Sequence, residues 1–295
     1  MVKTELWTLN KMRGDSQIPV KIKLAIDNLE ELPPIPAIAK HILELKDDLY
    51  GDIATLASII ELDPSIAAQV LKWVSSPLYG GRKYSRVKDA IFTIGYDSLL
   101  NLVFGLCILS PLKAPVEGKF GIRNYWIQFF SGQILLSQLG KQTTIDTKPL
   151  CMGYLLHNIG YLLMAHIFKK EFDLLTKEVK TDDSPVIAIE RRLYGIDHEV
   201  IGAWLLSHWN IYEPIRSITL NHHNPYYEGE SKELVWLVCL TNALLGLIDV
   251  GDSKDFVSIK LLCTKLNVNE ESALNSVQEL SKNLKQIEIK VKGIL

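Results

Sequence analysis

Three features of this sequence predict an all-α protein. Apolar residues recur at the three- and four-residue spacing of amphipathic helices along most of the chain. No stretch alternates convincingly between apolar and polar residues with period two, and the Val-, Ile- and Thr-rich runs typical of strands are missing. Proline and glycine clusters interrupt the apolar periodicity often enough to indicate about fourteen short to medium helices.

The first part of the chain is divided by a proline-rich link. Residues 1–17 are polar and weakly patterned, which predicts a loose tail, and helical periodicity then covers 20–29. The segment Leu32-Pro33-Pro34-Ile35-Pro36 follows. Because proline lacks an amide donor and disfavours the α conformation in the preceding residue, we expect this link to be extended. Two short amphipathic helices should follow over 37–45 and 52–61.

The next helix carries a start signal and a stop signal. Asp63 is suited to the N-cap position, and Pro64 is suited to the first helical position because its missing N–H would be unpaired there in any case. The apolar spacing continues to Val74. The sequence then enters a turn rich in Ser, Pro and Gly over 75–81, so the helix is predicted to end there.

Two more helices complete the N-terminal half. The first covers 87–93 and should end at Gly95. The second covers 97–109, is strongly apolar, and is expected to be capped by Asp97 or Ser98.

From Ile122 onward the predicted helices are longer, and the last of them, over 270–290, is typical of an outer amphipathic helix. The breaks between these helices fall near 140–141, 182–185, Gly195, 224–225 and 251–252.

Composition indicates an ordinary globular protein. The chain is 47% hydrophobic with a formal net charge of −2, so charge provides no general attraction to nucleic acid or to an anionic membrane. The four cysteines are far apart in apolar runs, which favours reduced core thiols and a cytoplasmic location. The apolar runs 150–168 and 234–248 contain polar residues and favour buried helices over membrane spans. We therefore expect neither DNA nor membrane as a partner.

The most informative stretch for function is the run 153–163. A polar pair, His157-Asn158, lies inside an almost wholly apolar segment with a glycine on each side. Burying polar groups costs free energy unless they find partners, so the pair is either a hydrogen-bonded core centre or the remains of a site. Six of the seven histidines fall within the 67 residues that begin at His157.

Seven motifs follow one another along the chain. They are Leu32-Pro33-Pro34-Ile35-Pro36, Ile60-Glu61-Leu62-Asp63-Pro64, Ser75-Ser76-Pro77-Leu78-Tyr79-Gly80, Ala90-Ile91-Phe92-Thr93-Ile94-Gly95, Leu155-Leu156-His157-Asn158-Ile159-Gly160, Asp197-His198-Glu199-Val200-Ile201-Gly202-Ala203-Trp204-Leu205-Leu206 with Trp209, and His222-His223-Asn224-Pro225. This ordered set resembles the HDOD family, the output-domain relative of the HD and HD-GYP metal-dependent phosphohydrolases. Each motif alone is weak, but their order from about Asn28 to Asn224 is specific.

The resemblance implies an HD-domain-like helical bundle with an N-terminal helical subdomain packed against it. The HDOD domain would cover 18–225, with an N-terminal helical part at 18–112 and an HD-like part at 120–225. Residues 226–295 would add C-terminal helices packed on the same core.

The metal centre of the HD enzymes is degenerate in this chain. By resemblance, the early histidine of the HD enzymes corresponds to Gln128, the His-Asp pair to His157-Asn158, and the late aspartate to Asn242. An amide is nearly the shape of a carboxylate but carries no charge and is a poorer cation ligand. Losing two carboxylates and an imidazole should weaken metal binding by orders of magnitude, so we expect no conventional hydrolase centre and no cofactor.

The remaining histidines allow two interpretations. His157, His198, His222 and His223 could form a pure imidazole site for zinc or another transition metal. We favour the alternative, in which they hydrogen-bond to Asn158, Asn242 and one another in a polar seam. Glu199 is a poor candidate ligand beside His198, because adjacent side chains on a helix diverge by about 100°. Outside the motif positions, His166 and His208 are expected to be partly exposed helix residues.

Two functions from different classes follow. The first is a non-catalytic signal-transduction module that acts through protein–protein interaction, with partners such as sensor kinases or cyclic-dinucleotide enzymes. The alternative is a residual metal-dependent phosphohydrolase or phosphodiesterase of the HD type, which would retain a divalent metal. The sequence does not indicate the identity of the partner or the oligomeric state.

Overall fold

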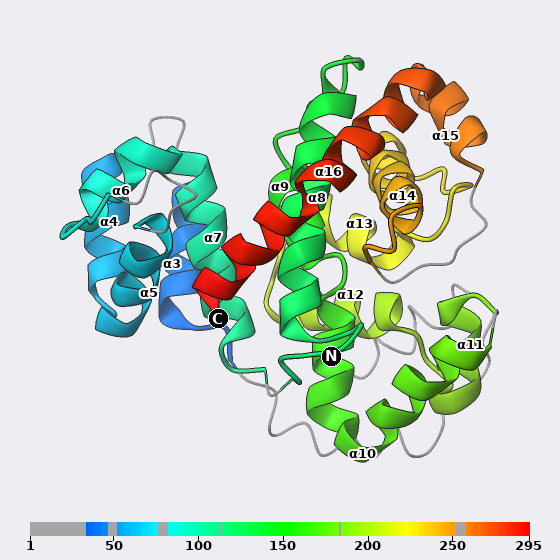
Figure 1. Ribbon diagram of the computed structural model, residues 1–295. Helices are drawn as coiled ribbons and strands as arrows, with labels where there is room; N and C mark the ends of the chain where they lie inside the picture. Colours follow the sequence, from blue (N-terminus) through cyan, green and yellow to red (C-terminus); the bar gives the residue numbers. More distant parts are fainter. Residues whose placement is uncertain (1–33, 47–51, 76–81, 113, 183, 252–257) are drawn as a thin grey trace. The chain divides into compact units, whose positions relative to one another are not determined.

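The structure, a computed structural model, describes residues 34–46, 52–75, 82–112, 114–182, 184–251 and 258–295. Within these ranges every regular element is a helix, which confirms the predicted all-α class (Figure 1). The expected tail at 1–17, the helical segment at 20–29 and the turn from Ser76 to Gly81 lie outside the described residues.

The chain divides into two compact units. One contains Pro33–Leu112 and Lys285–Leu295 and is called the N-terminal unit; the other, which includes Lys113–Leu284, is called the central unit. The sequence pattern places all of 226–295 on one core, whereas the structure groups the last eleven residues with the N-terminal unit.

Five short helices form most of the N-terminal unit. They are α3 (Ala37–Lys46), α4 (Ile53–Glu61), α5 (Pro64–Val74), α6 (Val87–Ile94) and α7 (Tyr96–Leu109). Helix α6 packs on α4, α5 and α7, and α3 packs on α4 and α7. The apolar faces expected from the 3.6-residue period meet in this core, where Ile42, Leu56 and Val70 are fully buried.

The predicted cap of α5 is confirmed, and the predicted cap of α7 is wrong. The Asp63 side chain accepts hydrogen bonds from the backbone N–H groups of Ser65 and Ile66, and Pro64 is the first helical residue. Helix α7 instead begins directly after Gly95, which has a φ of 85°. Glycine tolerates this positive φ, so one residue both ends α6 and starts α7, and Asp97 lies in the first turn of α7.

The central unit contains longer helices. They are α8 (Ile122–Gly140), α9 (Leu150–Leu156), α10 (Ile159–Thr181), α11 (Val186–Tyr194), α12 (His198–His208), α13 (Ile215–Asn221), α14 (Lys232–Gly246), α15 (Ile259–Leu266) and the first part of α16 (Glu270–Ile294). Helix α12 packs between α10 and α13, while α8 packs on α9 and α14. Two tryptophans at this core, Trp126 and Trp204, are each 1% exposed.

The apolar run 150–168, read from the sequence as one buried helix, is broken at the polar pair. Helix α9 ends at Leu156 and α10 begins at Ile159, so His157 and Asn158 occupy the junction. Asn158 has φ −102° and ψ 14°, outside the regular helical range. Its side-chain Nδ2 atom donates a hydrogen bond to Oε1 of Gln128 on α8. The break between α9 and α10 therefore lies at the residue that makes this contact.

Among the described residues, one stretch, Leu150–Lys169, is long and apolar enough to cross a membrane, and up to three spans would result if each of two sharply bent helix pairs counted as one. In the protein 83% of the Leu150–Lys169 window is buried.

Candidate functional site

The polar pair lies in a densely packed part of the central unit. A Cβ atom added at Gly160, at the start of α10, would overlap the backbone carbonyl of His198, the first residue of α12. A Cβ atom at Gly202 would lie 3.1 Å from the backbone nitrogen of Gly160. These two glycines therefore allow α10 and α12 to approach at the level of the backbone, which brings the polar pair next to the histidine-bearing start of α12.

The first part of the site is a chain of hydrogen bonds that we call the amide network, made by Gln128, Tyr154, His157, Asn158 and Asn242. The His157 Nδ1 atom lies 2.6 Å from the carbonyl oxygen of Tyr154. Because a carbonyl can only accept, Nδ1 carries the hydrogen and Nε2 of the neutral ring is an acceptor. The Gln128 Nε2 atom lies 3.4 Å from that acceptor, and the Gln128 Oε1 atom accepts from Asn158 Nδ2 at 3.0 Å.

Tyr154 joins the late amide to this network. Its hydroxyl donates to Asn242 Oδ1 at 2.8 Å, and its ring stacks on His157 with the centroids 4.4 Å apart. Tyr154 fits against α8 because Gly132 has no side chain at the point where a Cβ atom would overlap the tyrosine ring. All four motif residues of the network, Gln128, His157, Asn158 and Asn242, are at most 4% exposed.

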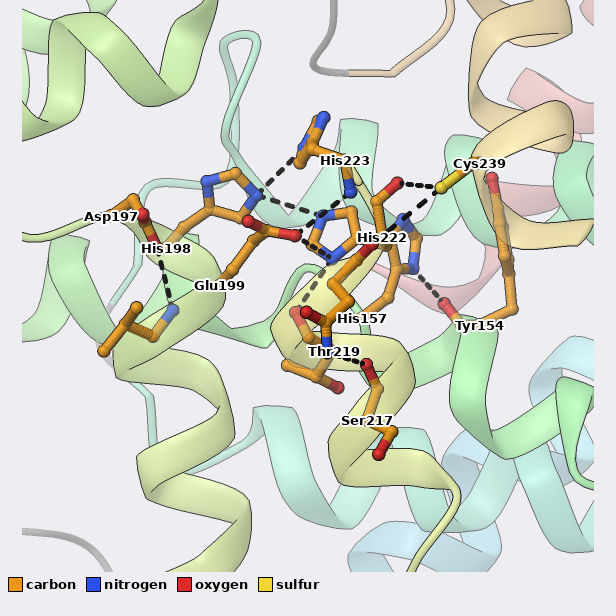
Figure 2. Close-up of polar contacts among 12 residues, drawn as sticks. Tyr154, His157, Asp197, His198, Glu199, Ser217, Thr219, His222, His223 and Cys239 are labelled. Atoms are coloured by element: carbon orange, nitrogen blue, oxygen red, sulfur yellow. Dashed lines mark hydrogen bonds and ion pairs between the residues drawn. The ribbon is translucent and has the colours of Figure 1, made fainter. Parts of the chain in front are cut away.

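The second part of the site, which we call the imidazole cluster, consists of His198, His222 and His223. Figure 2 shows the three rings turned toward one another from the start of α12 and from the end of α13. The His198 Nε2 atom lies 3.1 Å from His222 Nε2 and 3.2 Å from His223 Nε2. One ring nitrogen from each residue lies within 4.8 Å of the other two, and His157 is not a member of this group.

Each buried ring of the cluster is held from behind by an acceptor. The His198 Nδ1 atom lies 2.8 Å from Oε2 of Glu190 on α11, and the same oxygen accepts from the His198 backbone N–H at 3.0 Å. The His222 Nδ1 atom lies 2.9 Å from the carbonyl oxygen of Thr219. Carboxylates and carbonyls behind Nδ1 leave Nε2 as the atom that faces the cluster.

Two further contacts position His222 and His223. The backbone N–H of His223 donates to Oε1 of Glu199 at 3.0 Å, and that oxygen lies 3.6 Å from His222 Nδ1. The Cys239 thiol, from α14, donates to the backbone carbonyl of His222 at 3.0 Å (Figure 2). Glu199 thus holds the turn that carries the two adjacent histidines.

The electrostatic setting of the cluster is acidic and enclosed. Glu190 is fully buried, and burial raises the pKa of its carboxyl, while the neighbouring His198 acts in the opposite direction. Asp197, 1% exposed, caps α12 by accepting from the backbone N–H of Val200 and is paired with Arg191 at 2.8 Å. The start of α12 is therefore fixed on its inner side by Glu190 and on its outer side by the Asp197–Arg191 pair.

All seven residues that the sequence assigns to the remnant site lie in the central unit, but they divide into two groups. Gln128, His157, Asn158 and Asn242 belong to the amide network, and His198, His222 and His223 form the imidazole cluster. The two groups are adjacent, since the His157 and His222 rings make an edge-on contact with centroids 4.9 Å apart. His166 is partly exposed and His208 is exposed, which confirms the expectation for both.

The residues of the amide network do not fit the metal centre of an HD-type hydrolase. The Nε2 atom of His157 carries the lone pair that would bind the ion. This atom faces the amide donor of Gln128. Asn158 directs its donor at Gln128, and Asn242 uses its oxygen to accept from Tyr154. A divalent ion needs acceptors with negative charge, and these positions present amides that are already hydrogen-bonded to protein groups.

Sequence reasoning missed the residues that support the site. Glu190, Tyr154 and Thr219 lie outside the recognised motif positions or act through a backbone atom. For Glu190 a signal exists in retrospect. It follows Ile189 on a predicted helix and precedes the motif residue His198 by eight positions. A buried glutamate costs free energy unless an imidazole or a cation is its partner.

Comparison with known proteins places this geometry in a family. The family model for the HDOD domain matches residues 32–225. The solved structure of a putative signal transduction protein from Marinobacter aquaeolei VT8 is 26% identical in sequence, with a TM-score of 0.83. The match covers 93% of the present chain and 65% of the Marinobacter chain. An HDOD domain protein of unknown function from Geobacter sulfurreducens is 21% identical with a TM-score of 0.74, covering 95% of this chain and 99% of its own.

An uncharacterized protein from Treponema pallidum (strain Nichols) is 24% identical over 236 residues, which are 77% of this chain and 45% of that protein. The chain thus spans less than half the length of this relative. The HDOD match alone covers well over half of the present sequence, in the region that contains both the amide network and the imidazole cluster. The chain belongs to the HDOD domain family.

Proposed function

We propose that this protein is a non-catalytic regulatory module of signal transduction that acts by binding other proteins. The observation that carries the proposal is the hydrogen-bonded chain Asn158–Gln128–His157. It occupies the positions at which an HD-type hydrolase would need charged ligands for a catalytic ion. Without that ion, no group in the amide network can make a hydroxide nucleophile near neutral pH.

The space beside the amide network supports the same interpretation. A cavity of about 10 Å³ is lined by Tyr125, Gln128, Asn158 and Tyr161, among others. Sites for small organic ligands are roughly 300–1,000 Å³, whereas a volume of this size is about that of one water molecule. A phosphate ester would require the surrounding helices to move apart.

The partners that the family resemblance favours are signalling proteins such as sensor kinases or cyclic-dinucleotide enzymes. The near-neutral net charge of −2 and the 83% burial of the Leu150–Lys169 window support a cytoplasmic protein that binds neither DNA nor membrane.

Catalysis is tested with phosphate monoesters, phosphate diesters and cyclic dinucleotides in the presence of Mg²⁺, Mn²⁺ or Zn²⁺. We expect the wild-type chain to turn over none of them faster than His157→Ala, because neither chain can activate water at the amide network. His208→Ala, which changes an exposed histidine outside the site, is the matched control. Turnover that is present in wild type and His208→Ala but lost in His157→Ala would favour the competing function, HD-type hydrolysis.

The binding half of the proposal is tested by affinity capture with the full chain as bait, followed by reconstitution with the purified partner. Phe92 in the N-terminal unit and Tyr226 in the central unit are each 69% exposed, so Phe92→Asp and Tyr226→Asp should leave the fold intact. We expect one of the two variants to lose the partner and so to identify the unit that makes the contact. A partner that binds the heat-unfolded bait equally well would contradict a folded docking surface.

A further inference from the structure

We propose that the imidazole cluster, His198, His222 and His223, is a binding site for a divalent transition-metal ion of the zinc type. The ion would be held by three Nε2 atoms, at a place distinct from the amide network. This inference does not depend on the proposed function, because a bound ion at this place can support the fold or regulate binding without any turnover.

The first argument is the tautomeric state of the two buried rings. His198 directs Nδ1 at the Glu190 carboxylate, and His222 directs Nδ1 at the Thr219 carbonyl. In the neutral form each ring then presents an unprotonated Nε2, yet the two Nε2 atoms lie only 3.1 Å apart. Two lone pairs that face one another at this distance can both be used by a single cation placed between them.

The second argument is the distance between the nitrogens. A tetrahedral zinc ion with Zn–N bonds of about 2.0–2.1 Å holds its nitrogen ligands about 3.3 Å apart. The Nε2–Nε2 distances from His198 to His222 and to His223 are 3.1 Å and 3.2 Å, within about 0.2 Å of that value. The ring nitrogens of His222 and His223 lie within 4.8 Å of one another, so the three rings converge on one place, and two of the three nitrogen pairs already have the spacing of zinc ligands.

A proton is the simplest alternative to a metal ion, and the third ring argues against it. One proton serves only one pair of rings, so protons could satisfy both contacts of His198 only if a second one were carried by His222 or His223. An ion placed between the three nitrogens accepts a lone pair from each. The arrangement of three rings about one point is thus better matched to a metal ion than to a shared proton.

The surroundings provide what a metal site needs behind its ligands. A metal-binding histidine almost always donates its other ring N–H to a carboxylate or a carbonyl, which orients the ring and increases its basicity. His198 has Glu190 in this role and His222 has Thr219. Glu199, 1% exposed, adds a second buried carboxylate beside the cluster, and its negative charge favours a cation there.

The donor set indicates the class of ion. Three imidazoles suit zinc, copper, iron, cobalt or nickel and are poor ligands for magnesium or calcium, which prefer oxygen. His198 and His222 are buried, whereas His223 is partly exposed, so an ion would enter on the His223 side and a solvent molecule could complete its coordination.

The experiment measures binding of Zn²⁺ and Co²⁺ to the full-length chain that has been stripped with chelator and exchanged into metal-free buffer. We expect one ion per chain, an absorption spectrum typical of tetrahedral Co²⁺, and a higher unfolding temperature when Zn²⁺ is added. His223→Ala should weaken Zn²⁺ binding at least tenfold. It is the preferred variant because a partly exposed side chain is removed and the fold should be retained, which circular dichroism checks.

His208→Ala serves as the matched control and should bind Zn²⁺ like wild type. The proposal is overturned if folded wild-type protein takes up less than a tenth of an ion per chain, or if His223→Ala and His208→Ala bind Zn²⁺ equally well. None of these measurements involves hydrolysis, so they can fail while the proposed regulatory function stands, and the reverse is also true.

Discussion

The amide network and the imidazole cluster are adjacent in one buried polar region, but different kinds of group meet in them. The contacts between amide side chains pair a donor with an acceptor, as in the hydrogen bond from Asn158 Nδ2 to Gln128 Oε1. In the imidazole cluster acceptors meet acceptors, since His198 and His222 present the same Nε2 atom to one another. Two atoms of the amide network, Asn158 Oδ1 and Asn242 Nδ2, are nevertheless buried without a hydrogen-bond partner, so the two regions differ in which kinds of group meet and not in whether every polar atom is paired.

The difference bears on which region can hold a cation. An amide has nearly the shape of a carboxylate but no charge, so Asn158 and Asn242 can pack and hydrogen-bond where they lie without attracting an ion. The imidazole cluster presents ring nitrogens, and Glu190 places a buried carboxyl group behind His198. Four predictions test this contrast.

The largest expected effect is on the packing that brings the two regions together. In Gly160→Ala the new methyl group would overlap the backbone carbonyl of His198, which no rotamer change can move away. We expect this substitution to lower the free energy of unfolding by about 3 kcal/mol, measured by urea denaturation.

Gly153→Ala is the matched control for that variant. Its methyl group would lie 2.6 Å from Ile218 Cδ1, the end of a flexible side chain, and a helical alanine gains up to about 1 kcal/mol over glycine. We expect a change within about 1 kcal/mol. Equal losses in the two variants would show that the backbone approach of α10 and α12 is not what joins the two regions.

The next prediction tests whether the amide network depends on the amide group of Asn158. Asn158→Asp would replace the donor that faces Gln128 Oε1 by a second acceptor, and turning the Gln128 amide over would remove the donor that faces His157. We expect the free energy of unfolding to fall by about 1–3 kcal/mol, measured by urea denaturation with a chelator present to exclude metal ions.

Asn242→Asp provides the comparison, because its retained oxygen can still accept from Tyr154, and it should lose less than Asn158→Asp. If Asn158 and Asn242 do correspond to HD ligands, the double variant Asn158→Asp with Asn242→Asp should regain stability on addition of Mn²⁺ and bind one ion more than wild type. No added ion in the double variant would contradict that correspondence.

The third prediction tests whether Glu190 supports metal binding by the imidazole cluster. Glu190→Gln keeps an acceptor behind His198 but removes the charge, and loss of such a supporting carboxylate typically weakens metal affinity 10–100-fold, or about 1.4–2.7 kcal/mol. Competition with a zinc-binding dye measures the change. Asp197→Asn alters a carboxylate of similar burial that caps α12 and pairs with Arg191, and its zinc affinity should stay near wild type.

Much of the fold could be predicted from the sequence, and the reasons for success and failure are specific. The helix α5 was predictable because Asp63 and Pro64 act within one turn of chain. The start of α7 was not, because Gly95 serves α6 and α7 at once and its positive φ leaves no mark that differs from an ordinary helix stop. Local signals identify elements well where the cap is a side chain.

The site shows the same limit at longer range. The motif order identifies His157, His198 and His222 as members of one site, but not that His157 is held by Gln128 while His198 and His222 meet at Nε2. That division depends on how α8, α11, α12 and α13 converge. The partner of Glu190 could not be predicted either, since an acidic residue on an apolar helix face indicates that some partner is needed, but a contact between residues eight apart on two helices has no fixed spacing rule.

The smallest expected effect concerns exposed charges and provides a comparison for the effects expected at buried polar groups. On α11, Arg191 pairs with buried Asp197, while the next residue, Arg192, pairs with Glu178 and Asp182 at the surface. Hydrogen bonds from Ser184 and then from Arg192 lower the pKa of the Asp182 carboxyl from 3.8 to about 2. Because the folded-state pKa is below the unfolded value, this carboxylate stabilises the fold above about pH 4, and the contribution is lost as the pH falls toward 2.

Asp182→Asn keeps an oxygen that can accept from the Ser184 backbone N–H but removes that pH dependence. We expect wild type to exceed the variant slightly in urea midpoint at pH 6 and the difference to shrink between about pH 4 and pH 3. Exposed ion pairs are screened by solvent, so the difference at pH 6 should be the smallest of the four. If Asp182→Asn lowers the free energy of unfolding as much as Asn158→Asp does, burial does not explain the larger effect expected at Asn158.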